Sequence, residues 1–187
     1  PAEFGGWKYV LIFFAFFLYG NTMKFDFVLD DDLFVRNHPM VQQGISAIPS
    51  AFTQGSMPHF KGSNFQIYRP AVVSFFTLQH AVFGKKPAGY HFVNILLYAL
   101  VCLACYELIR KLFPKFHPLY ALLSALLFLV HPVHTEVVAN IKSQDELLAA
   151  FGCLLSLRYA LVYLDQPDRS RSLVVSLLAY MLALFSK

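Results

Sequence analysis

Hydrophobic residues occur along this chain in long blocks that are separated by polar stretches. A helix that crosses a bilayer needs about 20 mostly apolar residues. The segments that the pattern predicts to cross a membrane are residues 7–27, 89–112, 119–130, 147–164 and 173–185. The third block is short, and we expect it to extend into residues 131–138. The pattern therefore predicts an all-α, polytopic membrane bundle with about five transmembrane helices.

A long polar interval, residues 28–88, separates the first two blocks and is interrupted by proline and glycine. It is too polar to cross a bilayer. Two stretches within it, Ile45 to Phe52 and Ala71 to Phe83, have apolar positions that suit short helices lying at the membrane interface. A connection of this length without structure would be unusual in a compact fold. We therefore expect short interfacial helices in this first outer loop.

The positions of the basic residues predict the orientation of the bundle. Lys8 precedes the first block, and basic residues also occupy the loops at 110–117 and 169–171. Cytoplasmic loops carry an excess of lysine and arginine. The N-terminus and these two loops are therefore predicted to be cytoplasmic. The loop 28–88 and residues 131–146 are then on the outer side.

Composition agrees with a membrane protein. The chain has 187 residues, of which 57% are hydrophobic and 14% are charged, whereas a soluble domain has about 25% charged residues. The net charge of +4 is small and lies mainly in and beside loops, and no basic run with interleaved aromatic residues is present in a soluble segment. The composition therefore argues against a nucleic-acid partner.

Charged residues near the inner ends of the blocks have simple interpretations. Glu107 and Lys111 have the i,i+4 spacing of a surface ion pair on one helix. Arg158 lies near the inner end of its block, where its long side chain can extend to the membrane surface. Neither feature predicts a function.

Three consecutive carboxylates, Asp30, Asp31 and Asp32, follow the first block. One interpretation is an Asp-rich turn or helix cap that ends the first span. The other is a functional site, because charge at the edge of a bilayer is costly to place. The triplet alone does not separate the two interpretations.

Further polar residues fall on the same predicted outer side, and they separate these interpretations in part. Carboxylates and histidines can hold a divalent cation or supply a general base, and basic side chains can hold a phosphate. His131-x-x-His134-x-Glu136 is not the HExxH zinc motif, because no glutamate follows His131; a polar helix end facing the headgroups explains it equally well. Together these residues suit an enzyme that takes a phosphate-bearing lipid donor at the outer leaflet. The outer set is Arg36, His59, Lys61, Arg69, His91, His134, Glu136, Asp145 and Glu146.

The order of several short motifs is distinctive. The motifs are Asp30-Asp31-Asp32 with Asn37, Tyr68-Arg69-Pro70, Gly89-Tyr90-His91-x-Val93-Asn94, His131-Pro132-Val133-His134-Thr135-Glu136 and Ser186-Lys187. In this order they resemble the membrane part of the transmembrane and tetratricopeptide-repeat O-mannosyltransferases, which belong to the GT-C glycosyltransferase superfamily. The resemblance covers nearly the whole chain. It implies that residues 1–187 are the N-terminal part of a GT-C-like transmembrane domain, followed by further spans and tetratricopeptide repeats.

The resemblance also implies a function. Such an enzyme moves a mannose-like sugar from a polyprenyl- or dolichyl-phosphate donor to serine or threonine hydroxyls of a protein acceptor. It is a multi-pass protein of the bacterial inner membrane or the endoplasmic reticulum, with an exoplasmic active site. Its expected partners are the lipid-linked donor, membrane lipids and the protein acceptor.

Roles for individual residues follow from the same resemblance. A carboxylate of the first outer loop is the catalytic base or a metal partner, which favours Asp31, with Asp30 and Asp32 as alternatives. The resemblance places a second outer acidic site at Glu136 and Asp145-Glu146. Together with the histidines on the same predicted side, the second outer polar site is expected to comprise His131, His134, Glu136, Asp145 and His91, and a divalent cation, if one is bound, to be held by Asp31, His134 and Glu136. The segment Lys142 to Glu146 departs from the Gly-Arg-small-Asp stretch that is usual in the family, which leaves the role of Asp145 open.

Arg69 and Lys187 are the predicted ligands of the donor phosphate. A lipid phosphate that leaves during transfer needs cationic stabilisation. Arg69 stands just before Pro70, at the expected start of an interfacial helix, and Lys187 falls toward the outer end of the last block. We expect the two side chains to contact the phosphate from opposite sides of one outward-facing cavity.

Three alternatives stay open at this point. The enzyme class could be right and the acceptor a glycolipid or a cell-wall polymer. The chain could instead be a non-catalytic scaffold or assembly subunit with the same fold. A transporter would be expected to have broken helices at the middle of the membrane, whereas here the polar residues gather at helix ends.

Overall fold

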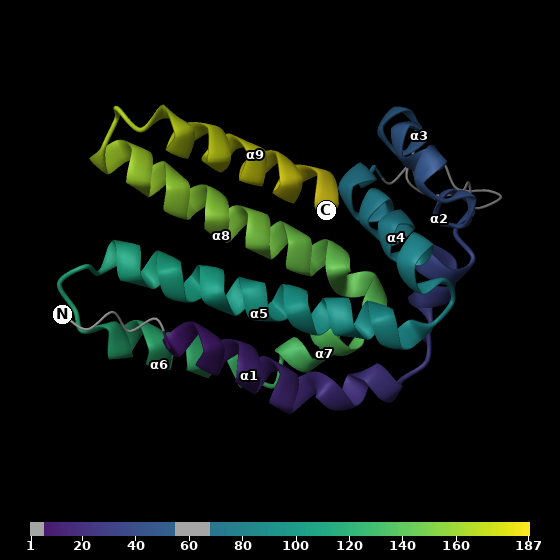
Figure 1. Ribbon diagram of the computed structural model, residues 1–187, viewed down its shortest axis with the longest axis horizontal. Helices are drawn as coiled ribbons and strands as arrows, with labels where there is room; N and C mark the ends of the chain where they lie inside the picture. Colours follow the sequence, from purple (N-terminus) through teal and green to yellow (C-terminus); the bar gives the residue numbers. More distant parts are fainter. Residues whose placement is uncertain (1–5, 55–67) are drawn as a thin grey trace.

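The computed structural model describes residues 6–54 and 68–187, and all regular structure in these ranges is helical (Figure 1). His59 and Lys61 of the predicted outer set lie outside the described residues. The α-helices are α1 Trp7–Tyr19, α2 Pro39–Gln43, α3 Ile48–Thr53, α4 Pro70–Phe83, α5 Pro87–Leu112, α6 Pro118–Leu129, α7 His134–Ala139, α8 Gln144–Asp165 and α9 Ser170–Ser186. Shorter elements are the 3-10 turns Gly20–Lys24, Ile45–Ala47 and Ile141–Ser143 and a π turn, Asp32–Arg36. The predicted all-α fold is confirmed.

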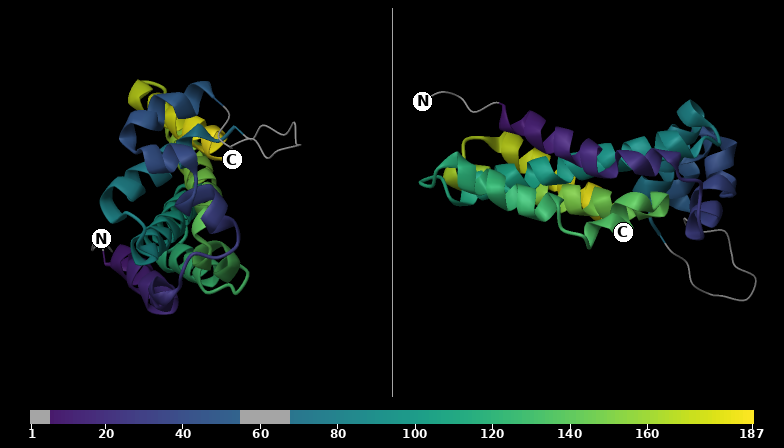
Figure 2. Two further views of the ribbon diagram at one scale, coloured as in Figure 1. Left: turned by 90° about the vertical axis from the view of Figure 1, so that its right-hand side faces the viewer. Right: turned by 90° about the horizontal axis from the view of Figure 1, so that it is seen from below.

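The long helices α5, α8 and α9 lie side by side, and α1 and α6 pack against α5 away from α9 (Figure 1). Helices α2, α3 and α4 gather at one end, which we call the α4 end (Figures 1 and 2). The opposite end, which we call the loop end, carries the short loops between α5 and α6 and between α8 and α9. The chain therefore has two distinct polar ends joined by apolar helices.

Proline sets the start of several of these helices. Pro39, Pro70, Pro87 and Pro118 each begin one, where the missing N–H costs nothing and the fixed φ suits the first turn. Helix α5 lies at the centre of the core, and its side chains Tyr90, Ile95, Tyr98 and Cys102 are buried against α1, α6 and α8. Burial of this apolar stripe explains why α5 holds the bundle together.

The seam between α8 and α9 is unusually close. A Cβ added at Gly152 would lie 2.6 Å from the carbonyl oxygen of Ala179. One turn along, the Ser176 hydroxyl donates to the carbonyl of Ser156 at 2.8 Å and lies 3.2 Å from its hydroxyl. Small residues on both helices therefore allow their backbones to approach.

Two helical segments of the described chain are long and apolar enough to cross a membrane, Pro87–Leu112 and Ile141–Asp165. Helices α6 and α9 fall where spans were predicted but are shorter apolar helices. Helix α1 has 13 residues, about 20 Å at 1.5 Å per residue. The described helices therefore support two crossings by length and composition, fewer than the five predicted.

The bounds of two predicted spans differ from the structure. The first was predicted at 7–27, but the α-helix ends at Tyr19 and the chain is extended by Phe25. The third was expected to continue into 131–138, but α6 ends at Leu129 and α7 begins separately at His134. Pro132 lies between them, and a proline cannot continue the hydrogen-bonding of a helix interior.

Candidate functional site

The acidic loop after α1 contains a strained backbone position. Leu29 has φ +45°, in the left-handed region that residues other than glycine rarely adopt. It is the one non-glycine residue with positive φ in residues 6–54 and 68–187. The next two carboxylates differ sharply, because Asp30 is exposed and Asp31 is completely buried. Strain of this kind tends to persist at functional sites.

Asp31 joins two distant parts of the chain. Its Oδ2 accepts the Val28 amide at 3.1 Å, and its Oδ1 accepts the Lys142 amide at 2.7 Å. Burial raises the pKa of the Asp31 carboxyl, although these amide hydrogen bonds act in the opposite direction. The carboxylate therefore fastens the acidic loop to the segment that leads into α8.

Replacing Asp31 by asparagine is expected to destabilise the protein by about 1–3 kcal/mol, because the new amide group turns a donor toward a backbone N–H. The folded state of the wild type binds the Asp31 proton more tightly than the unfolded state, so its stability falls as pH rises from 3.8 through the raised pKa. Thermal unfolding of the purified protein across this pH range measures both effects. A variant as stable as the wild type, or one with the same pH slope, would contradict this role.

A buried ion pair lies beside this junction. The Asp145 side chain is 3% exposed, and its Oδ2 lies 2.5 Å from Nη1 of Arg69 and 3.4 Å from Nζ of Lys142. Arg69 directly precedes α4, and Asp145 is in the first turn of α8. The Lys142 ammonium also lies 5.6 Å from the centre of the Phe34 ring. The helix dipole stabilises the negative charge of Asp145 at the N-terminus of α8. The two ion pairs of Asp145 hold the Arg69 and Lys142 side chains beside it.

The neighbouring residue forms a second pair. Oε1 of Glu146 lies 2.5 Å from Nζ of Lys187, which follows α9. The charges of Lys142 and Arg69 also act on the Glu146 carboxylate. The structure therefore brings Arg69 and Lys187 to adjacent residues of one helix turn. Three cations and two carboxylates at this place leave a net charge of +1.

Buried amide side chains hold the helices that carry these charges. Nε2 of Gln79 donates to Oε1 of Gln144 at 2.6 Å, and Nε2 of Gln144 donates to Oε1 of Gln79 at 3.1 Å. This reciprocal pair joins α4 to α8. Nδ2 of Asn94 donates to the carbonyls of Val138 at 3.1 Å and Asn140 at 2.8 Å, which fixes the segment before α8 against α5. The Oδ1 of Asn94 is buried without a hydrogen-bond partner among the described residues, whereas the reciprocal Gln79–Gln144 pair is expected to be rigid.

The other predicted outer residues are arranged differently. His91 is buried with its ring against Phe25. His134 packs on Phe128, and burial, followed by the charge of His131, lowers the pKa of His134. Glu136 is exposed. In the described part of the chain no hydrogen bond or ion pair connects these residues to Asp145, so the second polar site is not one cluster.

No metal-binding group is present in residues 6–54 and 68–187, where no three histidine, cysteine, aspartate or glutamate side chains are placed to hold a metal ion. Asp31, His134 and Glu136, the predicted ligands of a divalent cation, therefore do not form a ligand set in this geometry. Asp32 lies apart from them, in an exposed pair with Arg36 at 3.3 Å.

Reasoning from the sequence missed Lys142. Its amide binds Asp31 and its ammonium contacts Asp145, so it connects the two halves of the candidate site. The i,i+3 spacing of Lys142 and Asp145 at the start of an apolar block was a signal for this contact. The burial of Asp31 had no comparable signal, since it depends on the backbone at Leu29.

Comparison with known proteins gives a consistent result. The family model described as dolichyl-phosphate-mannose-protein mannosyltransferase matches residues 69–187. The human protein O-mannosyl-transferase TMTC1 is 37% identical over 153 residues, which are 81% of this chain and 17% of that protein. The human TMTC2 protein is 31% identical over 148 residues, and the mouse TMTC4 protein 32% over 169 residues. No solved structure matches the chain.

Each match covers most of this chain but only a small part of the longer relative. TMTC2 and TMTC4 cover 75% and 80% of this chain, and the chain spans 17% and 22% of their lengths. The family model covers more than half of the chain, including Arg69, the start of α8 and Lys187. With its two candidate membrane helices, the chain is that of a membrane protein, and it belongs to the dolichyl-phosphate-mannose-protein mannosyltransferase family.

Proposed function

We propose that this chain is the N-terminal part of the GT-C-like membrane domain of a protein O-mannosyltransferase. It would transfer mannose from a dolichyl- or polyprenyl-phosphate donor to serine or threonine hydroxyls on the exoplasmic side of the membrane. Membership of the family and the names of the related O-mannosyl-transferases support this proposal. The structural support comes from the α4 end of the bundle.

The proposed topology has the N-terminus in the cytoplasm and about five crossings. Helix α5 has 26 residues, about 39 Å at 1.5 Å per residue, which exceeds a hydrocarbon core of about 30 Å. Its two ends therefore reach opposite membrane surfaces. The loop end carries Lys8, Arg110, Lys111 and Lys115, which favours the cytoplasm by the positive-inside rule. The acidic loop at the α4 end is then exoplasmic.

Asp30 is the residue that we propose as the catalytic base. It is exposed, and within the described residues it has no hydrogen bond or ion pair, so its carboxylate can reach an acceptor hydroxyl. Asp31, favoured from the sequence, accepts backbone amides on both oxygens and would position the loop. The left-handed Leu29 directly before Asp30 supports this division of roles.

One observation carries the proposal, which is the hydrogen bond from the Lys142 amide to Asp31. It fixes the loop that bears Asp30 next to the segment that bears Lys142 and Asp145, and Asp145 in turn holds Arg69. A carboxylate and a set of cations from distant parts of the chain are thus tied to one place. Such fixed placement is what the transfer of a sugar from a lipid phosphate to an activated hydroxyl requires.

In the proposed reaction the acceptor oxygen attacks the anomeric carbon of the donor. Asp30 takes the hydroxyl proton as the new C–O bond forms. The bond between the anomeric carbon and the phosphate oxygen breaks, and its electron pair leaves with the lipid phosphate. Arg69 and Lys187 would stabilise that charge, as preorganised cations do without further reorganisation. Attack from the face opposite the phosphate inverts the anomeric configuration.

The test uses the full-length protein in lipid nanodiscs with labelled dolichyl-phosphate mannose and, in parallel reactions, a serine/threonine peptide or a glycolipid as acceptor. Formation of a mannosylated peptide with inverted configuration is the expected result. Transfer to glycolipid but not to peptide would replace the acceptor in this proposal. No transfer to either acceptor, together with intact folding, would favour a scaffold role.

Arg69→Ala is expected to raise the donor KM by about 10- to 100-fold. A hydrogen bond to a charged group contributes about 1.5–3 kcal/mol, and about 1.4 kcal/mol corresponds to a factor of ten. Arg69→Lys should recover only part of the loss, because lysine restores the positive charge but lacks the bidentate fork of the guanidinium. The matched control is Arg36→Ala, which removes an exposed arginine of the same outer loop. Donor KM equal to that of the wild type in Arg69→Ala would exclude Arg69 from phosphate binding.

A further inference from the structure

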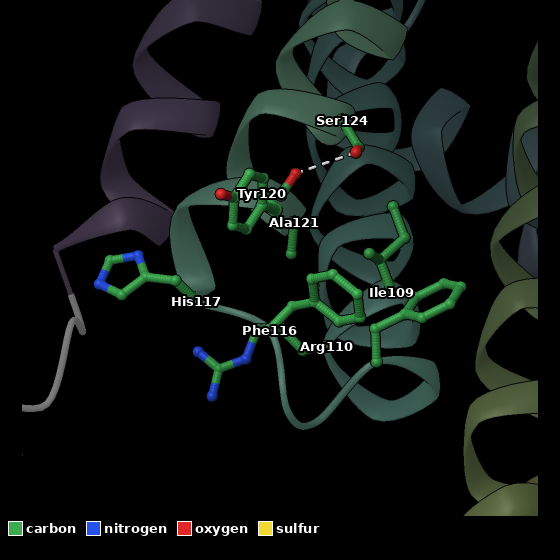
Figure 3. Close-up of a pocket in the computed structure, with 8 residues that line it drawn as sticks. Ile109, Arg110, Phe116, His117, Tyr120, Ala121 and Ser124 are labelled. Atoms are coloured by element: carbon green, nitrogen blue, oxygen red, sulfur yellow. Dashed lines mark hydrogen bonds between the residues drawn. The ribbon is translucent and has the colours of Figure 1, made fainter.

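A cavity lies at the loop end, far from the acidic loop and from the ion pairs at the start of α8. It has a volume of about 260 Å³ and lies between the end of α5 and the start of α6. Its lining residues are Ile109, Arg110, Phe113, Phe116, His117, Tyr120, Ala121 and Ser124 (Figure 3). Arg110 is 19 residues after His91 on one helix, about 28 Å along the axis. In the proposed topology the cavity therefore lies at the headgroup level of the membrane surface opposite the α4 end.

The walls of this cavity are aromatic. The ring of Phe116 lies edge-on to Phe113 at 5.9 Å and to Tyr120 at 6.1 Å. All three side chains are more than half exposed, from 53% for Phe113 to 61% for Tyr120. Exposed aromatic side chains at this depth are typical of the interface between lipid chains and headgroups.

An apolar surface continues from the cavity toward the middle of the membrane. Leu123 and Leu127 follow Tyr120 on α6 at helical spacing, and they are 47% and 71% exposed. The cavity and this surface together have the shape of a binding place for a headgroup with an attached hydrocarbon chain. A soluble anion would use the cavity alone.

Arg110 gives the cavity its charge. Lys8 and Arg158 each lie 3.0 Å from Glu107, and Lys111 pairs with Asp165. Arg110, by contrast, has no carboxylate partner in the described chain and donates only to the Tyr106 hydroxyl, at 3.4 Å. In Figure 3 its guanidinium and the imidazole of His117 extend to the same side of the cavity. A planar guanidinium at an interface is suited to a phosphate group.

We propose that this cavity binds an anionic phospholipid of the leaflet at the loop end. Arg110 holds the phosphate, the rings of Phe116 and Tyr120 contact the glycerol region, and one acyl chain follows Leu123 and Leu127. Basic pockets between membrane helices on the cytoplasmic side are a known place for acidic headgroups. The proposal does not depend on sugar transfer, since it uses no residue of the α4 end.

The experiment is native mass spectrometry of the full-length protein in detergent, with phosphatidylserine and phosphatidylcholine of identical acyl chains. Both lipids carry a phosphate, but the trimethylammonium group of phosphatidylcholine offsets its charge, whereas phosphatidylserine is net negative. The wild type is therefore expected to retain phosphatidylserine at about tenfold lower lipid concentration, a difference of about 1.4 kcal/mol. Arg110→Gln should remove this preference. Arg171→Gln is the matched control, because it removes an exposed arginine of the same end outside the cavity.

A second variant tests the same cavity independently, in case Arg110→Gln does not fold. Ser124→Phe fills the cavity without changing any charge, and it should also reduce phosphatidylserine retention. Inorganic phosphate should not displace the lipid, because it lacks the apolar contacts. Equal retention of the two lipids by the wild type, equal losses in Arg110→Gln and Arg171→Gln, or displacement by inorganic phosphate would each overturn the proposal.

Discussion

Replacing Asp30 by asparagine is expected to lower the rate of mannosyl transfer by about 10²- to 10⁴-fold, the range that a positioned general base contributes. Asparagine keeps the size of the side chain and cannot accept the hydroxyl proton. Asp30 is exposed, so folding should be unaffected. The measurement is kcat with saturating donor in nanodiscs, together with the thermal unfolding midpoint.

Its two neighbours provide the controls. Asp32→Asn changes a half-exposed carboxylate that pairs with Arg36 on the loop surface, and it should transfer mannose almost as the wild type does. Asp31→Asn should lose activity and stability together, because Asp31 holds the loop in place. Wild-type turnover in Asp30→Asn would remove Asp30 from the mechanism. A larger loss in Asp32→Asn would assign the base there.

Replacing Glu107 by alanine is expected to cost about 2–3 kcal/mol of folding stability. The Glu107 carboxylate lies 3.0 Å from Lys8 and 3.0 Å from Arg158, on three different helices around a cavity of about 270 Å³. Removing one member of a buried pair costs about 3–5 kcal/mol, because the remaining charge is left uncompensated. The expected loss of stability is smaller here, because more than a quarter of each of the Glu107 and Arg158 side chains is exposed.

The matched control removes a carboxylate from the other ion pair of the loop end. Asp165 is 65% exposed and pairs with Lys111, so Asp165→Ala should cost less than about 1 kcal/mol. Unfolding in detergent, followed by circular dichroism, compares the variants. In the Glu107→Ala background, Arg158→Met should restore part of the stability, because it removes the stranded charge. Equal effects of the Glu107 and Asp165 substitutions would contradict a special role for Glu107.

These charged contacts show what the sequence could and could not predict. Apolar blocks placed most of the helices, and Pro70 placed the start of α4, because both signals are local in the chain. Glu107 and Lys111 have correct i,i+4 spacing, yet each pairs with a residue more than 50 positions away. Arg158, expected only to extend toward the membrane surface, is one of those partners. Partners of this kind depend on how helices pack, which spacing does not encode.

The candidate site shows the same limit. The sequence predicted that the acidic triplet, Arg69 and Lys187 lie on one side of the membrane. It could not tell Asp30 from Asp31, because which carboxylate points outward depends on the left-handed backbone at Leu29. Nor could it place Arg69 and Lys187 on adjacent carboxylates of α8. Both facts depend on the tertiary structure.

The close approach of α8 and α9 at Gly152 has a consequence for how the protein enters the membrane. With the Ala179 carbonyl so near, there is no room for lipid between the two helices at that level. Helix α9 is the shorter and begins beside Arg169 and Arg171. We therefore expect the two helices to insert together as one hairpin, with their basic turn left on the side from which insertion begins.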